Sequence, residues 1–174
     1  MNRTQLRDSV IAGAAASALL LGTGTAAHAA DVAPPQNQPS QSCSDLTSEE
    51  AVSVWGALVL SADDSTETLD HADTSGYDRC ADLSWIVVPH GGTASSANSV
   101  MLFHHGIYKG TATAEPQAFV PQIERIDDGS ISITYRYLEG DEPNAAPQGR
   151  AESTFTWNDA SDSVDHEGEF PPTA

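Results

Sequence analysis

The residues best suited to acid–base or metal chemistry are two adjacent histidines, His104 and His105, which follow the apolar run 100–103. Neighbouring side chains on a strand point to opposite faces, so we do not expect the two imidazoles to bind one ion together. His104 shares a face with Val100 and Leu102 and is expected to be partly buried and hydrogen-bonded. We interpret the pair as structural. The alternative is a hydrolase in which His104 works with a nearby carboxylate.

Recognised motifs for hydrolysis are absent from the sequence. There is no G-x-S-x-G nucleophile turn, no S-x-x-K pair and no H-E-x-x-H metal motif, and His166-Glu167 has no second histidine at the required spacing. We therefore assign no catalytic residue, no metal ligand and no cofactor. A protein that is not an enzyme is the favoured interpretation.

Two groups of aspartates offer the hard oxygen ligands that Ca²⁺ prefers. They are Asp63, Asp64, Asp70, Asp73 and Asp78 in one segment, and Asp159, Asp162 and Asp165 in another. Neither group has the D-x-[DN]-x-[DN]-G spacing of a calcium-binding loop. We favour the interpretation that these side chains are ordinary solvated charges. The alternative is a weak Ca²⁺ site between the two loops, which would make the protein a calcium-stabilised structural module.

The charge balance is strongly acidic, with 25 acidic and 7 basic residues and a net charge of −18. Such a charge repels nucleic acid and anionic lipid. We expect no nucleic-acid partner, and either a solvated acidic surface or a cationic partner. Outside the first 29 residues, no segment approaches the length of a transmembrane helix.

The first 29 residues have the pattern of a cleavable signal peptide. Arg3 and Arg7 precede an apolar run at 10–21, and Ala27-His28-Ala29 matches the A-x-A cleavage pattern. Residues 30–42 are rich in Pro, Gln and Ser and are expected to form a disordered spacer, so that the domain spans 43–172. No cysteine directly follows the apolar run, as a lipid-modified signal requires. These features predict a secreted protein of the extracytoplasmic cell envelope.

The sequence contains two cysteines, Cys43 and Cys80, and export would bring both into an oxidising compartment. Only one intramolecular pairing exists, so we predict a disulfide between them. Metal ligation is the alternative, but zinc sites usually contain a short C-x₂-C spacing that is absent here.

The periodicity of the domain predicts an α+β fold, with one N-terminal helix packed on a mainly antiparallel sheet. Thr47 and Glu50 fit a capping box, and apolar residues then recur at helical spacing as far as Ser61. The expected strands are 83–88, 100–103, 107–109, 122–126, 130–138, 151–157 and 164–166. The first two are apolar on both faces, so they are expected in the middle of the sheet and covered on both sides.

Several adjacent motifs resemble those of one protein family. The segments LFHHGIYKGTATAEP (102–116) and ISITYRYLEGDEPNAAPQGRAESTFTW (131–157) are similar to the LppP/LprE family of actinobacterial secreted lipoproteins. The order of features, with an early cysteine, a helix and a second cysteine before L-S-W, also resembles that family. The resemblance covers about 43–172 and implies a small envelope domain without an active site to carry over. This chain departs from the family name in having an A-x-A pattern in place of a lipobox cysteine.

We therefore predict a non-catalytic binding or interaction domain for an envelope protein or a cell-wall component. Two loops are the expected interaction surfaces, G-T-A-T-A-E-P and N-A-A-P-Q-G. Their residues are Gly110, Thr111, Thr113, Glu115 and Pro116 in the first loop, and Asn144, Pro147 and Gly149 in the second. Gly110-Thr111-Ala112-Thr113 is also interpreted as the position of a strand bulge or of a close backbone approach.

Overall fold

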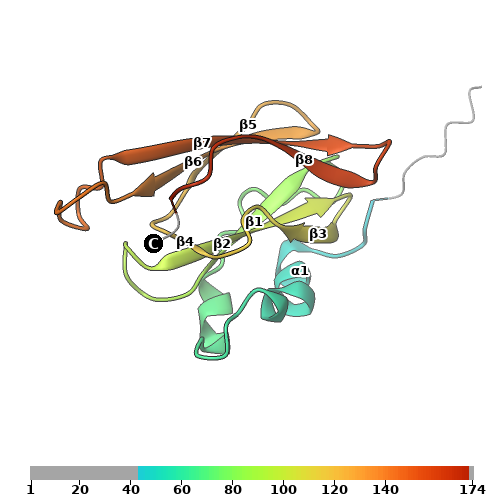
Figure 1. Ribbon diagram of the computed structural model, residues 1–174. Coiled ribbons are helices and arrows are strands. Elements are labelled where there is room, and N and C mark those ends of the chain that lie inside the picture. Colours follow the sequence, from blue (N-terminus) through green and yellow to red (C-terminus); the bar gives the residue numbers. More distant parts are fainter. Residues whose placement is uncertain (1–42, 173–174) are drawn as a thin grey trace, which may run out of the picture. The chain divides into compact units, whose positions relative to one another are not determined.

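The structure is a computed structural model that describes residues 43–172 (Figure 1). The predicted signal peptide, 1–29, and the predicted spacer, 30–42, lie outside the described residues. The described part folds into two antiparallel sheets, one short α-helix and two 3₁₀ helices.

The first sheet is built from β1 (Ser84–Pro89), β2 (Ala97–His104), β3 (Ile107–Thr111) and β4 (Gln117–Ala118). Strand β2 is central: it pairs antiparallel with β1 along one side, and with β3 and β4 along the other. Opposite β2, the register shifts by one residue next to Gly110, which has a positive φ of 127°. The bulge predicted there is confirmed.

The second sheet is a four-stranded meander of β5 (Gln122–Arg125), β6 (Ser130–Tyr137), β7 (Gly149–Asn158) and β8 (Ser163–Gly168). Alternate residues of β6 and β7 point inwards, as the period of two in the sequence predicts. Ile131 and Ile133 are completely buried.

The two sheets pack face to face around one hydrophobic core. Val87, Val100 and Leu102 of the first sheet meet Ile131, Tyr135 and Phe155 of the second. Residues 83–88 and 100–103 are buried on their other face too, since Ile86, Val88, Met101 and Phe103 contact the helical layer. The sheets and the helical segments thus form three layers, with the first sheet in the middle (Figure 1).

Helix α1 (Ser48–Trp55) starts at the predicted capping box. The Thr47 hydroxyl accepts from the Glu50 amide at 3.3 Å, and the Glu50 carboxylate accepts from the Thr47 amide at 2.8 Å. The helix ends earlier than predicted, because at Gly56 it tightens into the 3₁₀ helix η1 (Gly56–Leu58). A second 3₁₀ helix, η2 (Thr66–His71), lies within the acidic segment that was expected to be a loop.

The predicted combination of antiparallel strands with a short helix is confirmed, but the prediction of one sheet is wrong. Strands that are apolar on both faces require a cover on each side, and α1 covers only one face of β1 and β2. The other cover is the second sheet. None of the helices within 43–172 is long and apolar enough to cross a membrane.

Candidate functional site

A groove of about 670 Å³ opens beside β4, where the start of β2 lies close to the end of β6. Strand β4 is held there by two backbone pairs with β2, Ala97 with Ala118 and Asn98 with Gln117. The residues that line the groove come from five segments: Ser95 with Ala97, Glu115–Phe119, Arg136–Leu138, Asn144, and the tail Pro171-Pro172. The volume lies within the range of ligand-binding clefts, roughly 300–1,000 Å³.

The groove combines an apolar wall with an exposed acidic group. Phe119, Tyr137 and Leu138 line it, and Leu138 is 39 % exposed. The Tyr137 ring lies against Gly149, where an added Cβ would be 2.4 Å from a ring carbon. Gly149 therefore lets the ring approach the backbone of β7. The exposed Glu115 carboxylate adds negative charge to the lining.

The acidic loop 139–148 beside the groove is folded around one carboxylate. Glu142 Oε1 accepts hydrogen bonds from the amides of Glu139, at 2.7 Å, and Gln148, at 3.3 Å. These bonds, chiefly the one from Glu139, lower the pKa of Glu142 below its ordinary value. The Glu142 carboxylate therefore stays ionised to a lower pH than an ordinary glutamate.

The structure brings together part of the predicted interaction surface. Glu115, Pro116 and Asn144 come from the two predicted loops and line the same groove. Thr113 stabilises the first loop, since its hydroxyl donates to the Glu115 carbonyl at 2.7 Å.

The remaining predicted interaction residues lie elsewhere. Gly110 and Thr111 belong to β3 and line a second cavity, of about 290 Å³, between β3 and β8. Lys109 donates to Asp162 across this cavity at 2.9 Å. Pro147 and Gly149 are buried, so they support the second loop from within.

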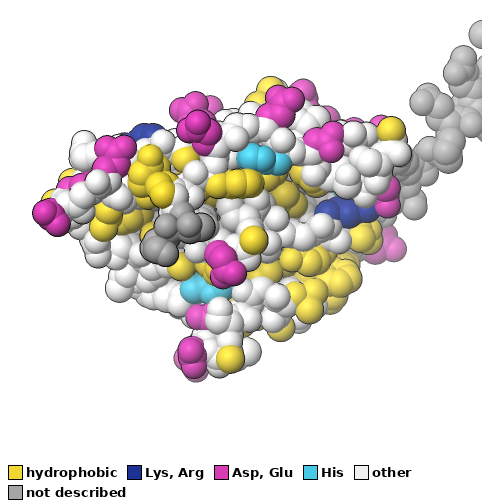
Figure 2. Space-filling model, viewed as in Figure 1, with side chains coloured by type: hydrophobic (Ala, Val, Ile, Leu, Met, Phe, Trp, Pro, Cys, Tyr) yellow, Lys and Arg dark blue, Asp and Glu magenta, His cyan; other side chains and the backbone are white. Residues whose placement is uncertain are grey.

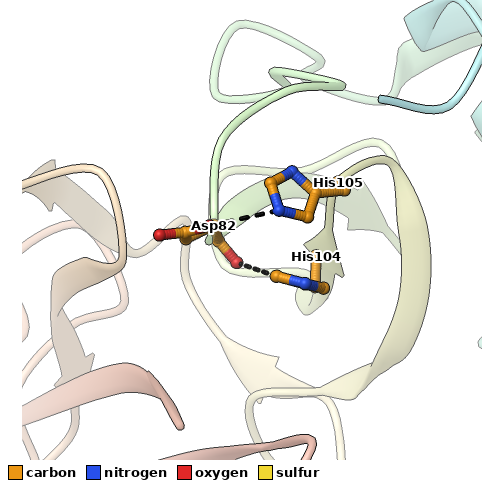
Figure 3. Close-up of side chains that lie close together, drawn as sticks. All are labelled: Asp82, His104 and His105. Carbon is orange, nitrogen blue, oxygen red and sulfur yellow. Dashed lines mark hydrogen bonds and ion pairs between the residues drawn. The ribbon is translucent and has the colours of Figure 1, made fainter. Parts of the chain in front are cut away.

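The side chains of the two adjacent histidines both point toward Asp82, so the prediction that they lie on opposite faces is wrong. Their rings lie 4.1 Å apart, and both contact Asp82 (Figure 3). The reason is the backbone at His105, whose φ of 47° takes it out of the strand and into the turn before β3. The alternation of side chains on a strand therefore stops at His104.

His104 and His105 each bond to a backbone carbonyl through Nδ1. The acceptors are the carbonyl of Asp82, 2.8 Å from His104, and the carbonyl of Cys80, 2.9 Å from His105. His104 also stacks on Trp157 at 3.8 Å between ring centroids. His105 Nε2 lies 3.2 Å from Asp82 Oδ1.

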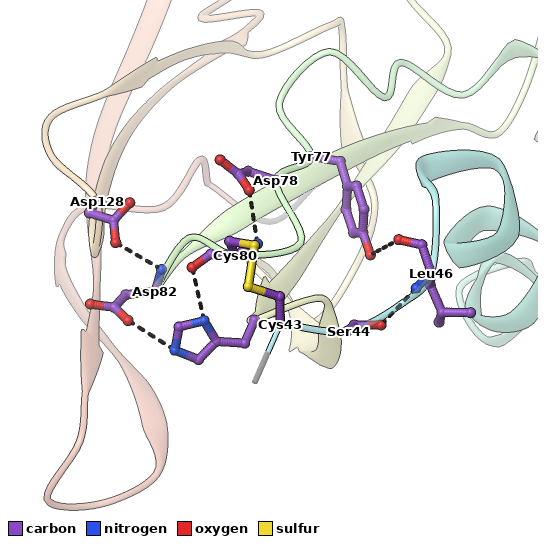
Figure 4. The surroundings of a disulfide bond; sticks show 9 residues. Cys43, Ser44, Leu46, Tyr77, Asp78, Cys80, Asp82 and Asp128 are labelled. Carbon is purple, nitrogen blue, oxygen red and sulfur yellow. Dashed lines mark hydrogen bonds and ion pairs between the residues drawn. A yellow bond between two sulfur atoms is a disulfide. The ribbon is translucent and has the colours of Figure 1, made fainter. Parts of the chain in front are cut away.

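Cys43 and Cys80 form the predicted disulfide, with their Cα atoms 4.7 Å apart (Figure 4). The Asp78 carboxylate accepts from the Cys80 amide at 2.8 Å, and Tyr77 donates to the Leu46 carbonyl at 3.3 Å. The bond thus joins the chain before α1 to the segment that leads into β1.

A third arrangement, which no sequence motif indicated, links Asp64, His90 and Ser99. His90 Nδ1 lies 2.6 Å from Asp64 Oδ2, and its Nε2 lies 2.8 Å from Ser99 Oγ. The order of contacts is that of a Ser-His-Asp triad. Asp64 also accepts from the Ser61 amide at 2.7 Å, and that bond first, with His90 second, lowers the pKa of Asp64. The members come from separate segments, so their spacing in the sequence gives no signal.

Among residues 43–172, the His/Cys/Asp/Glu side chains that gather closely enough to hold an ion are Asp82, His104 and His105. The aspartates of the two predicted calcium loops do not form such a group in the described part of the chain.

The fold and the disulfide define a small β-sandwich domain with a helical cover on one sheet. The family model for the LppP/LprE lipoproteins matches residues 75–160, and this segment therefore belongs to that family. Membership of a lipoprotein family indicates an extracytoplasmic or envelope-associated location. No curated protein and no solved structure matches the chain. Both cysteines of the sequence are in the disulfide, so neither offers a thiol for lipid attachment.

Proposed function

We propose that this protein is a secreted, non-catalytic binding domain of the cell envelope, and that the groove beside β4 holds a segment of a protein partner. The proposal includes export by the signal peptide 1–29 and a flexible spacer at 30–42. The lipoprotein family and the disulfide support the location. The single observation that carries the binding role is the groove itself, whose lining combines Glu115, Pro116 and Asn144 from two distant loops with apolar side chains.

The chemistry of the groove favours an extended protein segment with apolar side chains and positive charge. Tyr137 and Leu138 offer apolar surface, whereas Glu115 and the loop 139–148 supply carboxylates. The whole chain is acidic, with a net charge of −18, so association with a cationic partner is favoured electrostatically. Acidic side chains are also more numerous than Lys and Arg on the face shown in Figure 2.

The test compares two substitutions of exposed apolar residues. Leu138→Asp places a charge in the groove, whereas Val54→Asp places one on α1, at a residue that is 52 % exposed and does not line the groove. An envelope polypeptide that the immobilised, unmodified protein retains is identified, and the segment that binds is synthesised. The affinity of this peptide is then measured for the unmodified protein and for each of the two variants. We expect Leu138→Asp to weaken binding at least tenfold and Val54→Asp to leave it unchanged. Equal binding by all three proteins, or retention of wall glycan in place of polypeptide, would overturn the proposal.

A hydrolase is the second candidate, and the Asp64–His90–Ser99 arrangement is the observation that favours it. For hydrolysis, the Asp64–His90–Ser99 arrangement is a better candidate than His104 and a nearby carboxylate, which the sequence suggested. However, Ser99 is only 4 % exposed. This burial favours a structural role, in which His90 connects Asp64 to Ser99 of β2, over the role of an accessible nucleophile. A fluorophosphonate probe that labels Ser99, and labels it less in His90→Ala, would support catalysis. An unlabelled Ser99 would exclude it as a reactive nucleophile.

A further inference from the structure

His104 and His105, at the β2–β3 turn, and Asp82, which precedes β1, together have the composition of a transition-metal site. One imidazole nitrogen of His104, one of His105 and a carboxylate oxygen of Asp82 all lie within 4.8 Å of one another (Figure 3). All three residues are partly buried, so the group is neither fully exposed nor closed to solvent. Imidazole nitrogen and carboxylate oxygen are common ligands of Zn²⁺.

The hydrogen bonds of the two rings determine which nitrogen carries the lone pair. A backbone carbonyl only accepts, so the Nδ1 atoms that bond to the carbonyls of Asp82 and Cys80 must carry the protons. In the neutral ring of His105, the lone pair is therefore on Nε2, the atom that faces Asp82. Histidines that bind metals typically donate their other ring N–H to a carbonyl or carboxylate in this way.

The contact between His105 and Asp82 requires a positive charge between its two atoms, which a proton or a cation can supply. His105 Nε2 lies 3.2 Å from Asp82 Oδ1, yet this buried atom makes no hydrogen bond within the described part of the chain. In the neutral ring, a lone pair faces a carboxylate, and two acceptors repel each other. A divalent ion between the two atoms would bind both.

The surrounding structure holds the three residues in place. The disulfide fixes Cys80, whose carbonyl orients His105. The Asp82 amide donates to Asp128 Oδ2 at 3.3 Å, and His104 is stacked on Trp157. These contacts restrict the three side chains before an ion binds, which favours affinity.

We propose that Asp82, His104 and His105 bind a divalent transition-metal ion, with Zn²⁺ as the best match. The nitrogen ligands select against Ca²⁺ and Mg²⁺, which prefer all-oxygen sites. With three protein ligands, the fourth position of a tetrahedral Zn²⁺ would be taken by water. This site is separate from the groove and does not depend on the proposed binding function, since none of its residues lines the groove.

The test is calorimetric titration of the full-length, oxidised protein with ZnCl₂ and, separately, with CaCl₂. We expect one Zn²⁺ equivalent to bind, no Ca²⁺ to bind at the same concentration, and both His104 and His105 imidazole resonances to shift together in NMR spectra. His105→Ala and the isosteric Asp82→Asn should each weaken Zn²⁺ binding at least tenfold. His71→Ala removes an exposed histidine on η2 and should change nothing.

Three results would overturn the site. The first is no Zn²⁺ binding, in which case a proton alone bridges His105 and Asp82. The second is equal affinity in the unmodified protein and in Asp82→Asn, a variant that keeps the size of the side chain. The third is a comparable loss in His71→Ala, which would indicate nonspecific binding to surface histidines.

Discussion

Tyr135 is the largest of the fully buried side chains, with 2 % of its surface exposed. Its hydroxyl has no hydrogen-bond partner within 43–172. A buried hydroxyl without a partner loses its bonds to water without compensation. Burial also raises the pKa of the Tyr135 phenol well above its ordinary value, because the ionised form would be desolvated.

Removal of this hydroxyl should stabilise the protein. Tyr135→Phe keeps the ring in the core and removes the unpaired group, so we expect the free energy of unfolding at pH 7 to rise by about 1 kcal/mol. Urea denaturation followed by circular dichroism measures the change. Tyr137→Phe, at the partly buried next position on that face of β6, is the comparison and should have a smaller effect. A destabilised Tyr135→Phe would show that the hydroxyl has a partner.

The same residue predicts how stability depends on alkaline pH. The pKa of Tyr135 is higher in the folded than in the unfolded state, so its contribution to stability is constant below the unfolded value of about 10 and falls as pH rises above it. Tyr135→Phe should lose less stability than the unmodified protein between about pH 9 and 11. Parallel pH profiles for the two proteins would contradict this.

Individual residue positions were the least predictable from the sequence. The burial of Ile131, Ile133 and Tyr135 follows from strict alternation, and the structure confirms that they share the inner face. The orientation of His105 did not follow, because it depends on one backbone angle in a turn. The contacts of His90 with Asp64 and Ser99 join separate segments, and tertiary packing alone creates them.

At the scale of single elements, α1 depends on its cap because it has only eight residues. Thr47→Ala removes the side-chain acceptor for the Glu50 amide, so we expect a loss of about 1 kcal/mol in unfolding free energy. Ser53→Ala, at an exposed position inside the helix, should cause no loss and is the control. Equal stability of Thr47→Ala and the unmodified protein would mean that the cap contributes nothing.

The disulfide connects two elements that are 37 residues apart in the chain. In the chain-entropy account, closing a loop of this length stabilises the fold by about 4 kcal/mol. The double variant Cys43→Ser, Cys80→Ser should lose roughly that amount in denaturant titrations. Dithiothreitol should destabilise the unmodified protein and leave the double variant unaffected. If dithiothreitol has no effect on either protein, the bond does not contribute to stability.

Most elements were predictable, but their assembly was not. The capping box indicated the start of α1, and the expected strands correspond to those of both sheets except the two-residue β4. The division into two sheets did not follow, since a sandwich and one larger sheet produce the same alternation along each strand. The burial of β1 and β2 on both faces was the available signal, because a single helix of eight residues cannot cover a whole sheet.

At the scale of the whole molecule, the two sheets bring distant segments together at the groove. Glu115 and Pro116 precede β4, Asn144 lies between β6 and β7, and Pro171 follows β8. The family match at 75–160 includes the first three and stops before the tail. The sequence suggested the two loops but gave no means of predicting that they share one groove.

Site-specific photo-crosslinking in the native envelope tests the proposed binding role most directly. A photoreactive amino acid replaces Leu138 in the groove or, as the control, Val54 on α1. We predict that irradiation yields a discrete polypeptide adduct from position 138, that none forms from position 54, and that Glu115→Lys reduces the yield. No adduct from position 138, the same adduct from both positions, or an adduct with glycan would contradict the account.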